Sequence, residues 1–464
     1  MSTDNNNANV IFPQGSRWLR ADFHLHTKAD KEFSFTGDPS YYNSNYVQAL
    51  KDAGIEVGVI TNHNKFDFDE FMALRKTAKK EGIFLLSGVE LSLNDGSNGI
   101  HTLVVFHDEW IHEGKDYISP FITSVFPGKT PAEYQNENGR SDRNILQVIE
   151  ELNKTGRNYF LIFAHVEQKN GLWNEMSGGK IRDLSTARYD AVREKTLGFQ
   201  KVRTRDDRTN VKQWLQGWYP AEVEGSDPKS IDQIGEGIKC YLKIGDFTFE
   251  SIKYALLDHT HRMASEPQKS EHSYIRSVSF DGGVLDGKTI HLSSELNTLI
   301  GIRGSGKSSI LEAIRYVLDI PFGEKAMDTD YKTRLVEHTL GSGGKVTLKA
   351  VDQRGQEYEI RRICREKPDI YVDGTLQPGI SIRETILHKP IYFGQKDLSS
   401  TGDGFEKDLV EKLVGEKLTE IRRQISEQAQ KVAETVKRLK QGVGCPMGGG
   451  NANPLQRTVP ACSG

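Results

Sequence analysis

Short apolar runs alternate with helical stretches over residues 17–265. Runs of strand length that alternate with helices predict βα units around a mainly parallel sheet or barrel, an α/β fold. In such folds the chemistry gathers at the carboxyl ends of the strands. The predicted strands lie at 19–26, 55–63, 82–92, 100–106 and 158–166, and the predicted helices lie at 46–53, 69–80 and 143–153.

A polar segment, residues 266–273, separates this region from a second unit at residues 274–404, and we interpret it as an interdomain linker. The second unit combines one clear helix with several strand-like runs, two of which form a hairpin that turns at 352–355. Its predicted strands lie at 274–280, 289–302, 345–351, 358–364 and 390–395, and its predicted helix lies at 307–318.

A charged helix is predicted over residues 405–441. Its apolar side chains follow alternating steps of three and four residues, which is typical of the start of a coiled coil; the alternative is a single amphipathic helix packed on its own domain. The residues with this spacing are Leu418, Ile421, Ile425, Val432 and Leu439. Residues 1–16 and 442–464 lack periodicity and a core, so we expect both ends to be disordered.

The composition is that of a charged, water-soluble protein. The 464 residues include 61 Lys and Arg against 64 Asp and Glu, a net charge of −3. This balance excludes a generally polybasic nucleic-acid coat but permits a local basic groove. No apolar run approaches the roughly 20 residues of a membrane span, and the first residues lack a secretory signal. Four scattered cysteines fit a reducing compartment, so we expect a cytoplasmic protein that binds no membrane.

Histidines and carboxylates recur at the ends of the predicted strands. His24 and His26 alternate with Phe23 and Leu25, which places both imidazoles on one face of a strand. Imidazoles and carboxylates are ligands of divalent metals, and a buried ionised carboxylate is costly unless it is paired or bound to a metal. We therefore interpret the series as a metal site. Its later members are His63, Glu90, His101, His165 and Asp227.

In this order, the motifs HLH, TNH, GVELS, AH and GSD resemble those of the PHP (polymerase and histidinol phosphatase) superfamily. The resemblance covers residues 17–265 and implies a distorted βα barrel with a cluster of two or three metals that hydrolyses phosphoester bonds. The implied metal ligands are His24, His26, Glu90 and Asp227 at the first metal, Glu90, His101 and His165 at the second, and His63 at the third. The four ligands of the first metal are also the implied catalytic residues.

Two departures from the family pattern concern the third metal. Asn62 stands where the family often has Asp, and Lys229 stands where it often has a final His. We therefore expect two divalent ions (Zn, Mn or Fe) and a weakened third position, with Lys229 available to a substrate phosphate. A basic run shortly before Asp227 is a candidate for binding a phosphodiester backbone, or else a solvated surface. The candidate phosphate-binding residues are Lys201, Arg203, Arg205 and Lys229.

Residues 301–308 match the phosphate-loop pattern GxxxxGK(S/T) throughout, between a predicted strand and a predicted helix. Glycines let backbone N–H groups converge on phosphates, and the helix N-terminus adds favourable partial charge. Lys307 would reach the β- and γ-phosphates and Ser308 would bind Mg²⁺, which predicts ATP with Mg²⁺ as a cofactor. The predicted nucleotide-binding residues here are Gly301, Arg303, Gly304, Ser305, Gly306, Lys307, Ser308 and Ser309.

The elements around this loop resemble the amino-terminal half of SMC-type ABC ATPases. The resemblance implies that Gln395 is the Q-loop glutamine, which contacts Mg²⁺ and the attacking water. The whole chain resembles a PHP domain fused to such an ATPase, the TrlF-like architecture. The sequence contains no recognisable Walker B strand or signature motif. We therefore expect a truncated product, or an ATPase head that a second polypeptide or a second copy completes.

Together these features predict a metal-dependent phosphoesterase, a nuclease on DNA or RNA, coupled to an SMC-like ATP-binding module in DNA repair or anti-phage defence. Two alternatives remain open. One is a nucleic-acid-binding ATPase assembly protein with a catalytically weak PHP domain, which the departures at Asn62 and Lys229 favour. The other is a small-molecule phosphatase, which the fusion to an ATPase argues against.

Overall fold

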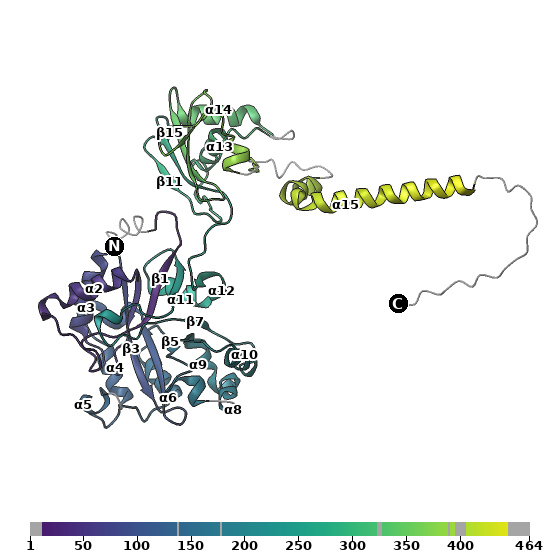
Figure 1. Ribbon diagram of the computed structural model, residues 1–464. Helices are drawn as coiled ribbons and strands as arrows, with labels where there is room; N and C mark the ends of the chain where they lie inside the picture. Colours follow the sequence, from purple (N-terminus) through teal and green to yellow (C-terminus); the bar gives the residue numbers. More distant parts are fainter. Residues whose placement is uncertain are drawn as a thin grey trace, which may run out of the picture.

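The computed structural model describes residues 12–136, 139–176, 179–322, 327–387, 390–394 and 405–443. Two separate β-sheets organise these residues, one of nine strands and one of six (Figure 1). The predicted linker, residues 266–273, lies between the last strand of the first sheet and the first strand of the second. Among the helices of the described residues, none is both long and apolar enough to cross a bilayer.

The first sheet consists of β1 (Arg17–Leu25), β2 (Val57–Ile60), β3 (Phe84–Leu93), β4 (Ile100–Phe106), β5 (Tyr159–Phe163), β6 (Thr196–Gln200), β7 (Ala221–Val223), β8 (Cys240–Ile244) and β9 (Met263–Ala264). Its order is β7-β6-β5-β4-β3-β2-β1-β8-β9. Two parallel groups, β1-β2-β3 and β5-β6-β7, are joined by β4, which is antiparallel to both of its neighbours. β8 is antiparallel to β1. The sheet is therefore mixed, and the prediction of a mainly parallel sheet was wrong on this point.

The segment after β7 nearly closes this sheet into a barrel. The N–H of Phe23 in β1 donates to the carbonyl of Glu224 at 3.1 Å, and the N–H of Asp227 donates to the carbonyl of His24 at 2.8 Å. β8 pairs with β1 only over Arg17–Ala21, which leaves the carboxyl half of β1 open to this segment. The distorted α/β barrel predicted from the sequence is confirmed.

Apolar side chains fill both faces of the first sheet, which explains why its strands are nearly continuous apolar runs. Leu85 belongs to one buried cluster and its neighbour Leu86 to the other, as the alternation of a strand requires. The helices are α2 (Tyr42–Asp52), α3 (Phe68–Lys80), α4 (Ile118–Val125), α5 (Pro131–Tyr134), α6 (Ile145–Lys154), α7 (Leu172–Glu175), α8 (Gly179–Arg182), α9 (Asp190–Lys195), α10 (Arg205–Trp214), α11 (Phe249–Leu257) and α12 (His259–Arg262). Helices α2, α3, α4 and α6 contribute to the cluster of Leu85, and α11 contributes to the cluster of Leu86.

The second sheet is antiparallel and consists of β10 (Tyr274–Asp281), β11 (Thr289–His291), β12 (Lys345–Val351), β13 (Glu357–Ile363), β14 (Asp369–Val372) and β15 (Thr375–Leu376). Helices α13 (Lys307–Val317) and α14 (Thr329–Leu340) share its buried cluster. The predicted hairpin is confirmed as β12 and β13, and the predicted helix is confirmed as α13. The core of this unit, centred on Val278 and Leu348, is separate from the two clusters of the first sheet.

Three predictions for the second unit and the chain ends need correction. The predicted strand at 289–302 is formed only at Thr289–His291, and residues 390–394 of the predicted strand at 390–395 are not in a strand. Gln395 lies outside the described residues. Phe12, in the predicted disordered tail, is buried and contacts the ring of Phe247. The rest of that tail, residues 1–11, and residues 444–464 at the other end also lie outside the described part.

The predicted helix after the second unit is present as α15 (Phe405–Val443). Its spaced apolar side chains are exposed: Ile421 is 52% exposed, and Ile425 and Leu439 are each 63% exposed. This face is therefore not packed against the described part of its own chain. A coiled coil requires a second helix against this face, and none lies there among the described residues, so the start of a coiled coil stays a prediction.

Candidate metal centre and phosphate loop

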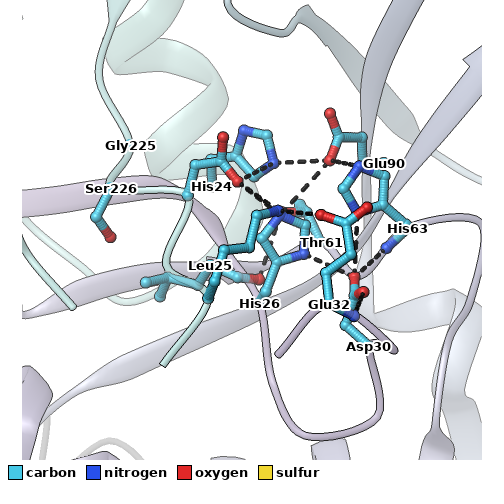
Figure 2. Close-up of polar contacts among 12 residues, drawn as sticks. His24, Leu25, His26, Asp30, Glu32, Thr61, His63, Glu90, Gly225 and Ser226 are labelled. Carbon is cyan, nitrogen blue, oxygen red and sulfur yellow. Dashed lines mark hydrogen bonds and ion pairs between the residues drawn. The ribbon is translucent and has the colours of Figure 1, made fainter. Parts of the chain in front are cut away.

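His24 and His26 lie at the carboxyl end of β1, and their side chains are fully buried. The ring centroids are 4.8 Å apart, so both imidazoles lie on the same side of the strand, as their spacing predicts. Nε2 of His24 lies 2.9 Å from Oε2 of Glu90, and Nε2 of His26 lies 3.6 Å from the same oxygen. The buried carboxylate of Glu90, on β3, thus faces both histidines (Figure 2).

Glu90 also faces the predicted ligands of the second and third metals. His63 follows β2 and places Nε2 3.0 Å from Oε2 of Glu90. On the other oxygen, Oε1, Nδ1 of His101 lies at 2.9 Å and Nε2 of His165 at 3.4 Å. One carboxylate therefore bridges two sets of imidazoles, which is the arrangement that a pair of neighbouring metal ions requires.

Asp227 completes the group that the sequence predicts. Its Oδ1 lies 3.0 Å from Nε2 of His26 and 3.9 Å from Nε2 of His24. The backbone of Asp227 has φ +55°, a left-handed conformation that costs a non-glycine residue about 1 kcal/mol. Its neighbour Gly225 is needed for a different reason: a Cβ there would lie 2.5 Å from Cβ of His24. The segment can approach β1 only with glycine at that position.

Asp22, in β1, forms hydrogen bonds with the segment that carries Asp227. Its carboxylate accepts hydrogen bonds from the hydroxyl of Ser226 at 2.5 Å and from the backbone N–H of Ser226 at 3.1 Å. It also accepts one from the N–H of His24 at 3.0 Å. The same carboxylate thus contacts β1, which carries His24, and the segment after β7, which carries Asp227.

Two acidic residues of the centre were not singled out in the sequence. Asp30 is buried, and its Oδ2 lies 2.9 Å from Nδ1 of His26 and 3.3 Å from Nδ1 of His63. Glu32 lies on the same loop, with Oε1 3.9 Å from Nδ1 of His63. Their position four and six residues after His26 was the available signal, because a loop that leaves the strand at His26 returns across the same edge (Figure 2).

The histidines hold the carboxylates of the centre in their ionised form. Burial alone would raise the pKa of Glu90, but His24, His63 and His101 outweigh it and hold the pKa well below its ordinary value. Burial would likewise raise the pKa of Asp227, but His24 and His26 hold it below its ordinary value. Burial alone would lower the pKa of His63, yet the charges of Glu90 and Asp30 raise it to about 11. The carboxylates are therefore charged ligands at neutral pH.

These donor atoms fit divalent metal ions. Three groups place their ligand atoms within 4.8 Å of one another: His24, His26 and Glu90; His26, Asp30 and His63; and His63, Glu90 and His101. Nδ1 of His165 is buried and has no hydrogen-bond partner among the described residues. Imidazole nitrogens and carboxylate oxygens are the ligands that zinc, manganese and iron accept. Two of the groups share Glu90, and the third is the one that includes Asp30.

The predicted phosphate-binding residues separate into two pairs. Nζ of Lys229 lies 3.1 Å from Oδ1 of Asp227, and Nζ of Lys201 lies 3.4 Å from Oδ2 of the same residue. Arg203 instead makes a bidentate ion pair with Glu224, at 2.5 and 2.7 Å. Arg205 is an exposed residue at the start of α10. The two lysines are therefore at the metal centre, whereas the charge of Arg203 is already balanced by a carboxylate.

The phosphate loop, residues 301–308, runs into the first two residues of α13. Gly304 and Gly306 have φ values of +84° and +89°, which residues with a side chain rarely adopt. Nζ of Lys307 donates to the carbonyls of Gly301 at 2.6 Å and Ile302 at 2.8 Å. The ammonium group therefore lies inside the phosphate loop, and it would exchange these carbonyls for a phosphate oxygen. The other predicted nucleotide-binding residues, Arg303, Ser305, Ser308 and Ser309, lie in the same loop and in the first turn of α13.

The strand expected before this loop is absent from the described residues, and the segment at 296–302 is exposed instead. Leu296 is 93% exposed, Ile300 is 91% exposed and Ile302 is 83% exposed. In a strand these three residues would share one face, because side chains alternate with a period of two. The segment thus presents exposed apolar side chains beside the phosphate loop.

Comparisons with known proteins place this geometry beside two kinds of fold. No protein family model matches the chain, and no curated protein matches it. A crystal structure described as a metal-dependent phosphoesterase from Bifidobacterium adolescentis is 14% identical and covers 51% of this chain and 95% of its own, with a TM-score of 0.32. An amidohydrolase from Chromobacterium violaceum, solved with sulfate and no metal, is 13% identical and covers 47% of this chain and 90% of its own, with a TM-score of 0.30.

A further solved structure is similar to part of the chain. A structure of SMC ATPases, described in terms of ATP-driven dimerisation and DNA-stimulated activation, is 22% identical and covers 30% of this chain and 99% of its own, with a TM-score of 0.24. All three TM-scores lie below 0.5, so the fold assignment rests on the strands and helices of this chain.

Proposed function

We propose that the chain is a metal-dependent phosphoesterase, and specifically a nuclease that cleaves DNA or RNA. The observation that carries the proposal is the carboxylate of Glu90, whose two oxygens face imidazoles on opposite sides within 2.9–3.6 Å. A carboxylate in this position would hold two neighbouring divalent ions, which support in-line displacement at phosphorus.

In such a reaction one set of residues would bind the metals and another would bind the phosphoryl group. When bound, the metals lower the pKa of a water molecule and offset charge on the phosphoryl oxygens. Glu90, His24, His26 and Asp227 would hold one metal, and Glu90 with His101 and His165 would hold the other. Lys229 and Lys201 place two ammonium groups at Asp227, where a phosphoryl oxygen would accept charge-assisted hydrogen bonds.

We further propose that the second unit binds ATP with Mg²⁺ and couples nucleotide to the nuclease. The phosphate loop supports this proposal, because Lys307 and the N-terminus of α13 converge on one loop. The exposed segment at 296–302 supports a partner, a second polypeptide or a second copy, that completes the ATPase head. A role in DNA repair or anti-phage defence belongs to the same proposal.

A second candidate function is a nucleic-acid-binding ATPase assembly protein with little phosphoesterase turnover. Asn62, one of the two departures, favours it: the side-chain oxygen of Asn62 accepts the backbone N–H of Thr27 at 2.8 Å, so this residue fixes the loop after β1 and supplies no carboxylate. A small-molecule phosphatase is the remaining alternative, and the same experiment distinguishes all three.

The test uses the whole chain with Mn²⁺, Zn²⁺ or Mg²⁺ and labelled single- and double-stranded DNA and RNA, with a nucleoside monophosphate as a small substrate. We expect metal-dependent cleavage of a polymer and its loss in the double variant His24→Ala/His26→Ala. The matched control is His259→Ala/His261→Ala, which removes the same motif from the exposed helix α12 and keeps activity. No polymer cleavage with any metal, or cleavage that survives loss of His24 and His26, contradicts the nuclease; release of phosphate from the monophosphate alone favours the phosphatase.

A further inference from the structure

Gln200, the last residue of β6, is fully buried between segments that carry metal ligands. Its Oε1 lies 3.0 Å from Nδ1 of His24 and accepts the backbone N–H of His165 at 3.1 Å. Its Nε2 donates to the carbonyl of Gly225 at 3.5 Å. One side chain thus contacts the ends of β1 and β5 and the segment that leads to Asp227, and no role in the proposed reaction has yet been given to it.

The backbone N–H of His165 determines which way the Gln200 amide points. A backbone N–H can only donate, so the amide atom that faces it is the oxygen. An amide oxygen can only accept, so Nδ1 of His24, which faces the same oxygen, carries a proton. In a neutral imidazole with its proton on Nδ1, the lone pair is on Nε2.

This nitrogen, Nε2 of His24, faces the carboxylates of the metal centre. It lies 2.9 Å from Oε2 of Glu90 and 3.9 Å from Oδ1 of Asp227. A lone pair directed at two anions is unfavourable without a cation between them and favourable with one. The proton that Gln200 holds on Nδ1 therefore selects the form of His24 that binds a metal.

Gln200 also fixes the second metal position through its contact with His165. His165 has φ +28°, a backbone conformation that non-glycine residues seldom adopt. The hydrogen bond from the N–H of His165 to Oε1 of Gln200 holds this conformation, and the N–H of Val166 donates to the carbonyl of Gln200 at 3.0 Å. His165 in turn places Nε2 3.4 Å from Oε1 of Glu90.

We propose that Gln200 is a positioning residue that prepares both metal positions, because it fixes the proton of His24 and the backbone of His165 with one oxygen. The inference rests on the metal centre of the proposed function and is independent of the substrate. Gln200 contacts neither the substrate nor the metals, so its effect appears in metal affinity before it appears in turnover.

The first test measures Mn²⁺ binding by calorimetry on the metal-free full chain. Gln200→Met keeps the size of the side chain and removes the acceptor, and we expect it to weaken Mn²⁺ binding by about 10- to 100-fold, the usual effect of losing such a support. Gln200→Glu retains an oxygen for both donors and restores the affinity. Gln213→Met makes the same change at an exposed position of α10 and leaves the affinity unchanged.

The second test determines by NMR which ring nitrogen of His24 carries the proton. In the Zn²⁺-loaded full chain with ¹⁵N-labelled histidine, long-range ¹H–¹⁵N spectra distinguish the ring nitrogen that carries hydrogen, and His24→Gln assigns the signal. We expect hydrogen on Nδ1 of His24. Hydrogen on Nε2, or a folded Gln200→Met variant that binds Mn²⁺ as tightly as the unchanged chain, overturns the proposal. If Gln200→Met does not fold, the spectrum of the unchanged chain decides. A chain that cleaves no phosphoester but gives both expected results contradicts the proposed function alone.

Discussion

Asp227 is the residue at which the histidine cluster meets the two lysines that we propose for substrate binding. Its two carboxylate oxygens face His26 at 3.0 Å, Lys229 at 3.1 Å and Lys201 at 3.4 Å. Nζ of Lys229 also lies 2.8 Å from Oε2 of Glu32. Burial alone would lower the pKa of Lys229, but Asp227 and Glu32 outweigh it and raise the pKa above its ordinary value, so this ammonium keeps its charge at every working pH.

Replacing Lys229 separates the two roles of this position. Lys229→Met removes a permanent charge beside the phosphoryl group, and a hydrogen bond to a charged group is worth about 1.5–3 kcal/mol, so we expect KM for a phosphodiester to rise by about 10- to 100-fold. Mn²⁺ affinity stays the same or increases, because the ammonium no longer competes for Asp227. Steady-state kinetics and calorimetry measure the two effects.

The matched control for this variant is Lys239→Met, which removes the same charge from an exposed residue away from the metal centre. It should change neither KM nor Mn²⁺ affinity. If Lys229→Met weakens Mn²⁺ binding and leaves KM unchanged, Lys229 supports the metal ligands and does not contact the substrate.

At the level of single residues, the sequence predicts metal ligands better than it predicts their supports. His24, His26 and Glu90 belong to apolar strands, and the period of two and the strand ends determine where they point. Asp30 contacts His26 only because the loop after β1 folds back, and a hydrophobic pattern does not encode a loop path. Gln200 was not predicted because an amide is not a metal ligand and its role depends on three segments meeting.

At the scale of elements, the apolar runs predict where strands and helices occur but not how the strands are directed. β4 is as apolar as β3 and β5, although it runs antiparallel to both, because a strand buried on both faces gives the same pattern in either direction. The strand predicted before the phosphate loop shows that an apolar run can also fail to form a strand. Its sequence is suited to a strand, but no neighbouring strand pairs with it within the described residues.

The start of α6 provides a test of an element through its pH dependence. Oδ2 of Asp95 accepts the N–H of Ile145 at 2.7 Å, and burial raises the pKa of Asp95 from 3.8 to about 6. Between these values the unfolded chain has lost this proton and the folded chain retains it, so rising pH lowers the stability. The loss is complete above pH 6 and is on the order of 3 kcal/mol.

Asp95→Asn stays neutral and keeps an oxygen for the N–H of Ile145. We therefore expect the difference in free energy of unfolding, variant minus unchanged chain, to increase from pH 4 to pH 6. The difference should then stay constant to pH 7. Urea denaturation at each pH measures the difference between the two proteins, in which all shared titrating groups cancel. A difference that is constant over this range contradicts a raised pKa at Asp95.

At the scale of the whole molecule, two sheets with separate cores carry two kinds of site. The first sheet forms its own closed site, because strands from both parallel groups bring their ends to Glu90. The phosphate loop differs, since the segment before it has no strand beside it in the part of the chain that the structure describes. The histidine–carboxylate cluster therefore lies within its own unit, whereas exposed apolar side chains precede the phosphate loop.

These exposed side chains predict association through the segment at 296–302. Burial of one isoleucine side chain is worth about 1.5–3 kcal/mol, so the loss of two in Ile300→Ser/Ile302→Ser should weaken association with a second copy by at least about 100-fold, measured by analytical ultracentrifugation with ATP and Mg²⁺. Lys307→Ala, which removes the phosphate contact, should abolish ATP binding and any association that depends on it. The matched control is Val284→Ser, at an exposed apolar residue outside this segment, which should leave association unchanged. Association that survives Ile300→Ser/Ile302→Ser contradicts a contact through the segment at 296–302.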